Sequence, residues 1–373
     1  MTVNPEGGVH VLVGTRKGAY LLDGDRTRRK WRVRGPYHEG LDVFQIVADP
    51  RAPGTVYSTA NSPWWGPRMF RSIDWGRRWS EISVPQMPKG RRAAPGPEGP
   101  PKYPVVNVWQ IAPGRAEEPG SLLCGIDPAS LWRSDDRGGS WIGYPGLNEH
   151  PTRDRWNPGA GGMCLHTILR DPKQPKRLYV AISAAGGFRS EDDGEHWTPV
   201  NRGVKIGFLP PGPHEVGQCL HKLAFEPSDP ATLYRQDHDG IFVTHDRGER
   251  WTRIGRPLES DFGFVVATAP AAPGGAYFVP LRGQTRTTWG GHLQVFRWNE
   301  SRRSWSQLIP KRQFPGDHGT HRDALATDSL DPAGVYLGTT TGRLYWSATG
   351  GKAWSELPYQ FPAIQSVTVA APA

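Results

Sequence analysis

Short runs of alternating apolar and polar residues recur along the whole chain, for example VHVLVG at 9–14 and RLYVAIS at 177–183. Alternation with a period of two is typical of a strand with one buried face. No segment repeats apolar residues at helical spacing over three turns, and the chain contains 46 Gly and 37 Pro in 373 residues. The pattern therefore predicts an all-β protein built from many short strands.

A repeated sequence motif, S-x-D-x-G-x-x-W, divides the chain into units of similar size. Its clearest copies are RSIDWGRRWS (71–80), RSDDRGGSWI (133–142) and RSEDDGEHWT (189–198), and weaker copies end at Trp31, Trp251, Trp305 and Trp354. The seven final Trp residues are 48 to 62 positions apart. This spacing predicts seven structural repeats of about 50 residues.

A second recurring feature, a short apolar run ending in a turn, precedes the motif in six of the seven units. The runs are FQIVADP (44–50), VWQIAPG (108–114), HTILRDP (166–172), HKLAFEP (221–227), FVVATAP (264–270) and DALATDS (323–329). The first unit lacks such a run, and a seventh, QSVTVAAP, lies at the end of the chain, at 365–372. We expect this last strand to complete the first unit, as the closure of a ring requires.

The chain is accordingly predicted to be one domain over 1–373, a single seven-bladed β-propeller of four-stranded antiparallel blades. Blade 1 combines 9–33 with 365–372, and the Pro/Gly-rich segment 83–105 is a loop insertion. The other blades are expected at about 44–82, 106–144, 165–200, 219–254, 264–308 and 323–357.

The S-x-D-x-G-x-x-W motif itself matches a known repeat. Ser134, Asp136, Gly138, Ser140 and Trp141 fit the Asp-box pattern fully, and the chain thus resembles the Asp-box or BNR-repeat β-propellers, including bacterial exo-α-sialidase-like and sortilin-like proteins. In each turn the Asp is suited to accept backbone N–H bonds, the Gly to adopt positive φ and the Trp to pack between blades. We therefore expect the motif to be architectural, and function to lie on the opposite rim.

The resemblance also implies what a sialidase would need: three Arg residues on the substrate carboxylate, a Tyr-Glu pair and an early Arg-Ile-Pro motif. The nearest string, Arg253-Ile254-Gly255, lies in the fifth unit, and the sequence alone selects no triad from the candidate arginines. These candidates are Arg16, Arg153, Arg282, Arg286 and Arg322. Seven blades also depart from the six usual in sialidases, so true sialidase activity is not expected.

Long polar connections on the rim opposite the motif carry most of the candidate chemistry, including nine of the twelve His residues;. Carboxylates and imidazoles there suit acid/base chemistry on a glycosidic bond. The predicted catalytic residues are Glu215, Asp261, Asp323 and His321. The predicted substrate-binding residues are His38, Glu39, Trp156 and Arg322.

Two inner-strand segments, GGMCLHTIL (161–169) and VGQCLHKLA (216–224), place a Cys two residues before a His at matching positions. One reading is a divalent transition-metal site that includes His166 and His221, because neutral imidazole suits such ions. A second is a metal-free ligand-binding or catalytic role for these His residues. The third is packing between blades, with the small Cys residues simply buried.

Composition narrows the function classes. A net charge of +9 suits an acidic partner, but the basic pairs are scattered, so nucleic acid is not the expected partner;. Three Cys and no long apolar segment lead us to expect a cytoplasmic protein without membrane association;. Two hypotheses stay open: a hydrolase or lyase acting on a glycan or small molecule, and a non-catalytic scaffold that binds a protein partner.

Overall fold

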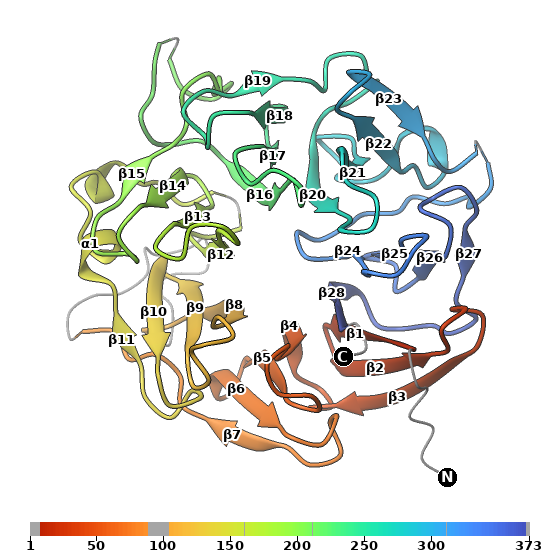
Figure 1. Ribbon diagram of the computed structural model, residues 1–373, viewed down its shortest axis with the longest axis horizontal. Helices are drawn as coiled ribbons and strands as arrows, with labels where there is room; N and C mark the ends of the chain where they lie inside the picture. Colours follow the sequence, from red (N-terminus) through yellow and green to blue (C-terminus); the bar gives the residue numbers. More distant parts are fainter. Residues whose placement is uncertain (1–7, 89–103, 160, 211, 311, 371–373) are drawn as a thin grey trace.

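Seven four-stranded antiparallel sheets surround a central axis in the computed structural model (Figure 1). It describes residues 8–88, 104–159, 161–210, 212–310 and 312–370. The predicted all-β, seven-bladed propeller is confirmed. Most of the proposed insertion at 83–105 lies outside the described residues.

Each blade is a meander whose first strand faces the axis. Blade 1 comprises β28 (Ile364–Ala370), β1 (Val9–Thr15), β2 (Gly18–Gly24) and β3 (Trp31–Tyr37). Blade 2 comprises β4 (Asp42–Ala48), β5 (Val56–Ser62), β6 (Gly66–Ser72) and β7 (Ser80–Ile82). Blade 3 comprises β8 (Asn107–Pro113), β9 (Leu122–Asp127), β10 (Ser130–Ser134) and β11 (Ile142–Gly143). Blade 4 comprises β12 (Leu165–Arg170), β13 (Leu178–Ile182), β14 (Gly186–Ser190) and β15 (Thr198–Pro199).

The remaining blades repeat this order. Blade 5 comprises β16 (Leu220–Phe225), β17 (Leu233–Asp237), β18 (Gly240–Thr244) and β19 (Thr252–Arg253). Blade 6 comprises β20 (Gly263–Thr268), β21 (Gly275–Pro280), β22 (Phe296–Asn299) and β23 (Ser304–Gln307). Blade 7 comprises β24 (Leu325–Thr327), β25 (Val335–Gly338), β26 (Leu344–Ser347) and β27 (Ser355–Glu356). The helical segments are α1 (Pro145–Asn148), η1 (Arg153–Arg155) and η2 (Trp289–Gly291).

The C-terminal strand closes the ring as predicted. β28 pairs antiparallel with β1, from His10 opposite Ala370 to Thr15 opposite Ile364, and Figure 1 shows β28 beside β1 at the inner side of this blade. Closure covers the apolar sheet faces that a linear array of blades would leave exposed at its two ends.

The hydrophobic core is divided into layers between neighbouring blades. One layer joins Leu123 and Leu131 of blade 3 to Ile168 and Val180 of blade 4. A fully buried Tyr recurs on the second strand of five blades: Tyr57, Tyr179, Tyr234, Tyr277 and Tyr336. The Tyr179 hydroxyl donates to the Arg247 carbonyl in the next blade at 3.0 Å. Such a buried ring with a bonded hydroxyl adds apolar packing and a polar link between neighbouring blades.

The repeated motif forms the third hairpin of its blade. In blade 3 the Gly138 N–H donates to Ser134 Oγ at 2.8 Å, and the Ser140 N–H donates to Asp136 Oδ1 at 2.9 Å. Gly138 has φ of 89°, a conformation that favours glycine;. The Arg137 N–H also donates to the Gly120 carbonyl in the first hairpin of the blade. These bonds give the motif a structural role, on what we call the motif rim.

Blade 7 shows that the bonding pattern survives a substitution. Thr349 stands where the copies in blades 2 to 5 have Asp, yet the Gly351 N–H still donates to Ser347 Oγ and the Ala353 N–H donates to Thr349 Oγ1, both at 2.9 Å. The hydroxyl thus replaces one carboxylate oxygen as an acceptor.

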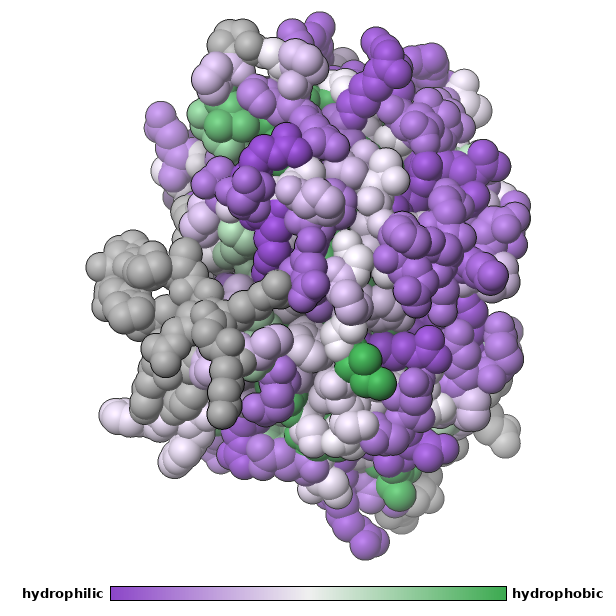
Figure 2. Space-filling view, turned by 90° about the vertical axis from the view of Figure 1, so that its left-hand side faces the viewer, coloured by the Kyte–Doolittle hydropathy of each residue, from purple (hydrophilic) through white to green (hydrophobic). Residues whose placement is uncertain are grey.

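The outer side of the ring is largely hydrophilic in the face that Figure 2 shows. Within the described residues, no helix is long and apolar enough to cross a membrane.

Candidate ligand site in the axial cavity

A cavity of about 860 Å³ opens at one end of the axis. It is lined by the starts of inner strands, such as Phe44 and His221, and by second hairpins, such as Ala184 and His238. In an antiparallel meander these parts lie on the rim opposite the motif turns. The cavity therefore lies on the side away from the motif turns, which we call the cavity rim; that this side carries the function stays a prediction.

A β-bulge at the same place in six inner strands brings side chains to the axis. Each bulge adds one unpaired residue, which re-aims its side chain. The register shifts fall at Phe44 in β4, Trp109 in β8, His166 in β12, His221 in β16, the 264–265 segment of β20 and Gln365 in β28. Phe44, Trp109, His221, Phe264 and Gln365 line the cavity.

Arg322 is a cation in the cavity wall with no carboxylate partner among the described residues. Its guanidinium carbon lies 5.5 Å from the Trp109 ring centroid and 5.9 Å from that of Phe264. Nη2 donates to Ser183 Oγ at 3.3 Å, whereas Nε is buried without a partner. No ion pair among the described residues includes Arg322. A partly desolvated guanidinium of this kind is suited to a planar anion such as a carboxylate.

Two carboxylates line the cavity in the described part of the chain, and each faces a cation. Glu215 accepts from Arg155 Nη2 at 2.5 Å, with both side chains about half exposed. Asp323 is largely buried and pairs with the Lys222 ammonium. His321 lies beside them in the wall, where burial lowers its pKa to about 4 and the Arg16 and Arg322 charges act in the same direction. At neutral pH this imidazole is uncharged and able to accept a proton.

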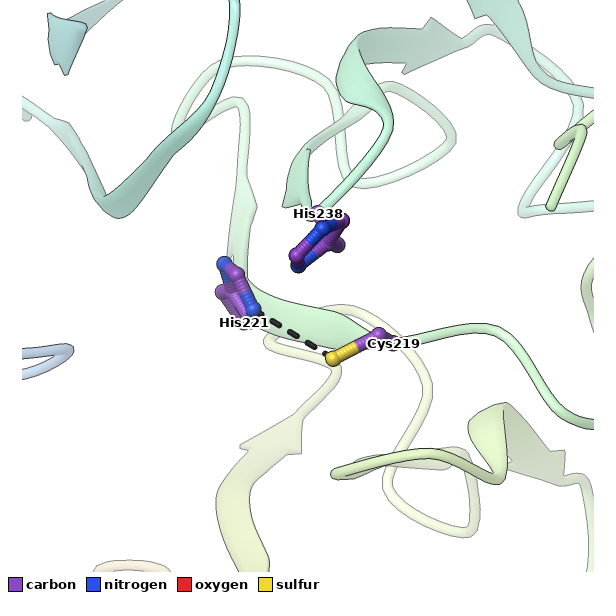
Figure 3. Close-up of side chains that lie close together, drawn as sticks. All are labelled: Cys219, His221 and His238. Atoms are coloured by element: carbon purple, nitrogen blue, oxygen red, sulfur yellow. Dashed lines mark hydrogen bonds between the residues drawn. The ribbon is translucent and has the colours of Figure 1, made fainter. Parts of the chain in front are cut away.

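Cys219, His221 and His238 form a compact cluster at the blade 5 side of the cavity (Figure 3). One ligand atom from each residue lies within 4.8 Å of the others. His221 is buried, Cys219 is partly buried and His238 is exposed at the β17–β18 hairpin. The His221 ring stacks on Phe264 with centroids 4.5 Å apart.

The structure brings Glu215, His221, His321, Arg322 and Asp323 together around one cavity, as the loop positions suggested. It places the other predicted site residues elsewhere. His166 has no cavity surface: its Nε2 bonds the Leu220 carbonyl at 2.9 Å and its Nδ1 bonds Thr167 Oγ1 at 3.0 Å. Both ring nitrogens are thus used inside the protein, and His166 does not join the metal-type cluster.

Four more predicted residues lie outside the cavity lining. Asp261 pairs with Arg253 at 2.7 Å. His38 stacks on Phe70 with centroids 4.1 Å apart, and burial lowers its pKa to about 4. Glu39 is exposed in the β3–β4 connection. Trp156 is buried and donates from Nε1 to Thr152 Oγ1.

Sequence reasoning did not select Cys219 or His238 as site residues, nor the aromatic wall formed by Phe44, Trp109 and Phe264. These aromatics look like ordinary strand residues in the sequence, and only the bulge turns them to the axis. The recurrence of a large side chain near the start of each apolar run was the available signal.

No family model matches the chain. It is 25% identical over 269 residues to an oligoxyloglucan-reducing end-specific xyloglucanase from Emericella nidulans, covering 61% of this chain and 31% of that protein. A probable enzyme of the same name from Neosartorya fischeri is 23% identical over 222 residues, covering 54% and 24%. The chain thus spans about a third or less of the length of these curated relatives, and is similar to glycoside-hydrolase propellers.

Solved structures show the same fold at low identity. An ancestral GH74 enzyme superposes with a TM-score of 0.57 at 15% identity, covering 88% of this chain and 38% of that one. The Niastella koreensis GH74 enzyme gives 0.56 at 14% identity, covering 95% and 65%. YCF48 bound to D1 peptide gives 0.52 at 12%, covering 88% and 96%. The Asp-box resemblance stays a prediction.

Proposed function

We propose that the chain is a glycan-directed hydrolase whose axial cavity binds a saccharide carrying a carboxylate. The similarity to xyloglucanases supports the glycan class. The cavity volume of about 860 Å³ suits a short oligosaccharide;. Its aromatic walls offer apolar faces on which sugar rings pack.

The observation that carries the acidic part of the proposal is Arg322, which contacts Trp109 and Phe264 and has no carboxylate partner in the part of the chain that the structure describes. Arg155 and Arg286 also line the cavity, whereas its two lining carboxylates are both paired with cations. An anionic ligand would therefore find uncompensated positive charge in a partly desolvated site, where it counts most.

Glu215 and Asp323 are the two carboxylates that glycoside hydrolysis requires on either side of the scissile bond;. Asp323, beside Lys222, is assigned the stabilisation of positive charge developing on the sugar ring. His321, kept neutral by burial, is assigned removal of a proton from the attacking water, and a solvent water at the half-exposed mouth supplies the proton to the departing sugar oxygen;. Glu215, at the half-exposed mouth, is assigned orientation of the attacking water.

The decisive experiment compares oligouronides with the same oligosaccharides after reduction of each carboxyl group to an alcohol. The pair has equal length and linkage and differs in charge. We expect the acidic forms to be cleaved with kcat/KM about 10-fold to 100-fold higher, because an Arg–carboxylate contact contributes about 1.5–3 kcal/mol. Arg322→Gln should erase this preference, and equal cleavage of both forms by the unaltered protein would overturn the acidic-ligand proposal.

The hydrolase assignment has its own test. Asp323→Asn and Glu215→Gln should each lower kcat by about 100-fold or more. Glu249→Gln is the matched control, because Glu249 forms a similar exposed pair, with Arg189 at 2.6 Å, near the motif turn of blade 5. If all three variants cleave equally, the cavity carboxylates are not catalytic.

A binding scaffold is the second candidate, favoured by one observation. Trp64 and Trp65 are 73% and 69% exposed in the β5–β6 hairpin, on the cavity rim. A photo-crosslinking residue at position 64 should then capture one defined protein partner that position 142 does not. Ile142 is the matched control, since it is a similarly exposed hydrophobic residue, on β11. Identical crosslinking patterns at both positions would exclude this candidate.

A further inference from the structure

The Cys219, His221 and His238 cluster has the composition of a metal site. A thiol and two imidazoles approach one another from two adjacent elements of blade 5, the start of β16 and the β17–β18 hairpin (Figure 3). The hairpin is tied to the strand start by the His238 N–H, which donates to the Cys219 carbonyl at 2.9 Å. The main chain therefore holds the first and third members of the cluster in a fixed relation.

His221 is oriented as a ligand would be. Its Nδ1 lies 2.6 Å from the Gly263 carbonyl oxygen, which only accepts, so Nδ1 must carry the proton;. The lone pair of the neutral ring is then on Nε2, which faces Cys219 Sγ at 3.4 Å. A carbonyl that fixes the tautomer and direction of a His ring is the usual outer support of a metal ligand.

The spacing fits a tetrahedral ion after a small movement. Bonds of about 2.3 Å to sulfur and about 2.0–2.1 Å to nitrogen place neighbouring ligand atoms about 3.3–3.6 Å apart. The Cys219–His221 pair already has this separation. Ligand atoms of the whole cluster lie within 4.8 Å, so closing it needs a shift of about 1 Å, and exposed His238 is free to make it;.

Both negative and positive side chains lie near the Cys219 sulfur. Burial raises the pKa of the Cys219 thiol to about 11; the Asp237 and Asp239 charges also raise it, and that of Arg322 lowers it. An incoming divalent ion replaces the thiol proton, which leaves to solvent as the thiolate–metal bond forms, and oxidation states do not change. The negative charge of Asp239 opposes the influence of Arg322 at this position, while the Ser183 hydroxyl supports the thiolate by hydrogen bonding.

We propose that Cys219, His221 and His238 bind one zinc-class divalent ion, with its fourth position open to the axial cavity. A borderline-soft ion matches one thiolate and two imidazoles, and three protein ligands with one open position are typical of reactive rather than purely structural zinc sites. All three residues line the cavity. The ion would therefore meet an oxygen of a ligand or water there, acting as a Lewis acid.

The test uses the reduced, metal-stripped full chain titrated with Zn²⁺, and with Co²⁺ as a spectroscopic substitute. We expect one ion per chain and, with Co²⁺, a thiolate-to-cobalt charge-transfer band together with the visible bands of a tetrahedral site. His238→Ala should weaken Zn²⁺ binding on the order of 100-fold, the share of one ligand in a site of this kind. Cys219→Ser should abolish the charge-transfer band.

His214→Ala is the matched control, because His214 also lines the cavity but bonds the Pro210 carbonyl and lies outside the cluster. It should bind Zn²⁺ as the unaltered chain does. The proposal is overturned if the unaltered chain takes up no Zn²⁺, if its Co²⁺ form lacks the thiolate band, or if His238→Ala binds Zn²⁺ equally well. None of these readouts depends on hydrolysis, so the metal site and the proposed glycan activity succeed or fail separately.

Discussion

Blades 4 and 5 carry the same Cys-x-His pattern at the same bulge, yet the two His residues lie in different environments. His166 and His221 are each the extra residue of their inner strand, and each bonds a main-chain carbonyl at the start of the next blade's inner strand. His166 uses Nε2 for this bond, whereas His221 uses Nδ1. The first ring is therefore fully bonded inside the protein, and the second presents Nε2 towards Cys219.

The residue after each His explains the difference. Thr167 offers a hydroxyl to His166 Nδ1 at 3.0 Å, which occupies its second nitrogen. Lys222 stands at the matching place in blade 5 and turns away to pair with Asp323. The bulge also occurs in blades that lack this Cys-x-His pattern, so the pattern does not set its position. The hydrogen bonding of the neighbouring residue decides whether the imidazole supports the fold or faces the cavity.

The second strands of the two blades, β13 and β17, also differ in whether their buried positions are apolar or charged. Val180 and Ile182 of β13 are apolar and buried, whereas the matching positions of β17 hold Arg235 and Asp237, a fully buried pair with N–O distances of 2.5 and 2.6 Å. Blade 5 thus buries an ion pair next to the cluster where blade 4 has simple packing.

The largest expected effect breaks that pair. Asp237→Asn should lower the free energy of unfolding by about 3–5 kcal/mol, because it leaves the Arg235 charge buried and uncompensated. Ile182→Val at the matching site of blade 4 should cost only about 1 kcal/mol. Urea unfolding followed by fluorescence measures the free energy of unfolding of both variants. An equal decrease in the two would contradict the claim that the buried ion pair makes β17 more sensitive than β13.

The second-largest effect is expected for His166, whose ring is bonded inside the protein. His166→Ala should destabilise the fold by about 2–4 kcal/mol, since it opens a cavity and leaves the Leu220 carbonyl unpaired;. His238→Ala should cost less than about 1 kcal/mol, because that ring is exposed;. Denaturation midpoints of the two variants, with metal absent, provide the measurement. A larger loss for His238→Ala would reverse the assigned roles.

Acid should weaken the fold through the buried His residues of the cavity rim. The pKa of His321 is lowered to about 4 in the folded chain, against about 6.5 when unfolded;. Its contribution is therefore complete above pH 6.5 and is lost as the pH falls towards 4, by about 1–2 kcal/mol at pH 5 after allowance for solvent screening. His321→Gln should flatten the pH dependence of unfolding between 7 and 5. A profile identical to that of the unaltered chain would contradict the shift.

The smallest effect concerns the motif rim, where repeated sequence does give repeated structure. Asp136→Ala should cost about 1 kcal/mol, because the Ser140 N–H and Ser134 hydroxyl lose their acceptor;. Asp136→Thr should recover part of this loss, since Thr349 fills the same role in blade 7. Thermal unfolding of the two variants tests the rank order, and a Thr variant less stable than the Ala variant would refute it.

Much of the fold could be predicted from the sequence because its signals are local and repeated. The Trp spacing counts the blades, and the displaced run at 365–372 requires closure by β28. The residues of the candidate site were harder to predict from the sequence than the fold. Glu215, His321, Arg322 and Asp323 were placed at the cavity from their loops alone, but Trp156 and His38, chosen on the same grounds, pack internally. Side-chain direction depends on bulges and on partners distant in sequence, such as Leu220 for His166 and Gly263 for His221.

Nitrogen-15 NMR of the histidine rings during a Zn²⁺ titration tests the contrast between the two blades most directly. The account predicts that, before metal is added, His166 carries its proton on Nε2 and His221 carries it on Nδ1. On addition of one equivalent of Zn²⁺, the resonances of His221 Nε2 and of one His238 nitrogen should shift, while both His166 resonances stay in place. A shift at His166, or the same tautomer in both rings, would contradict it.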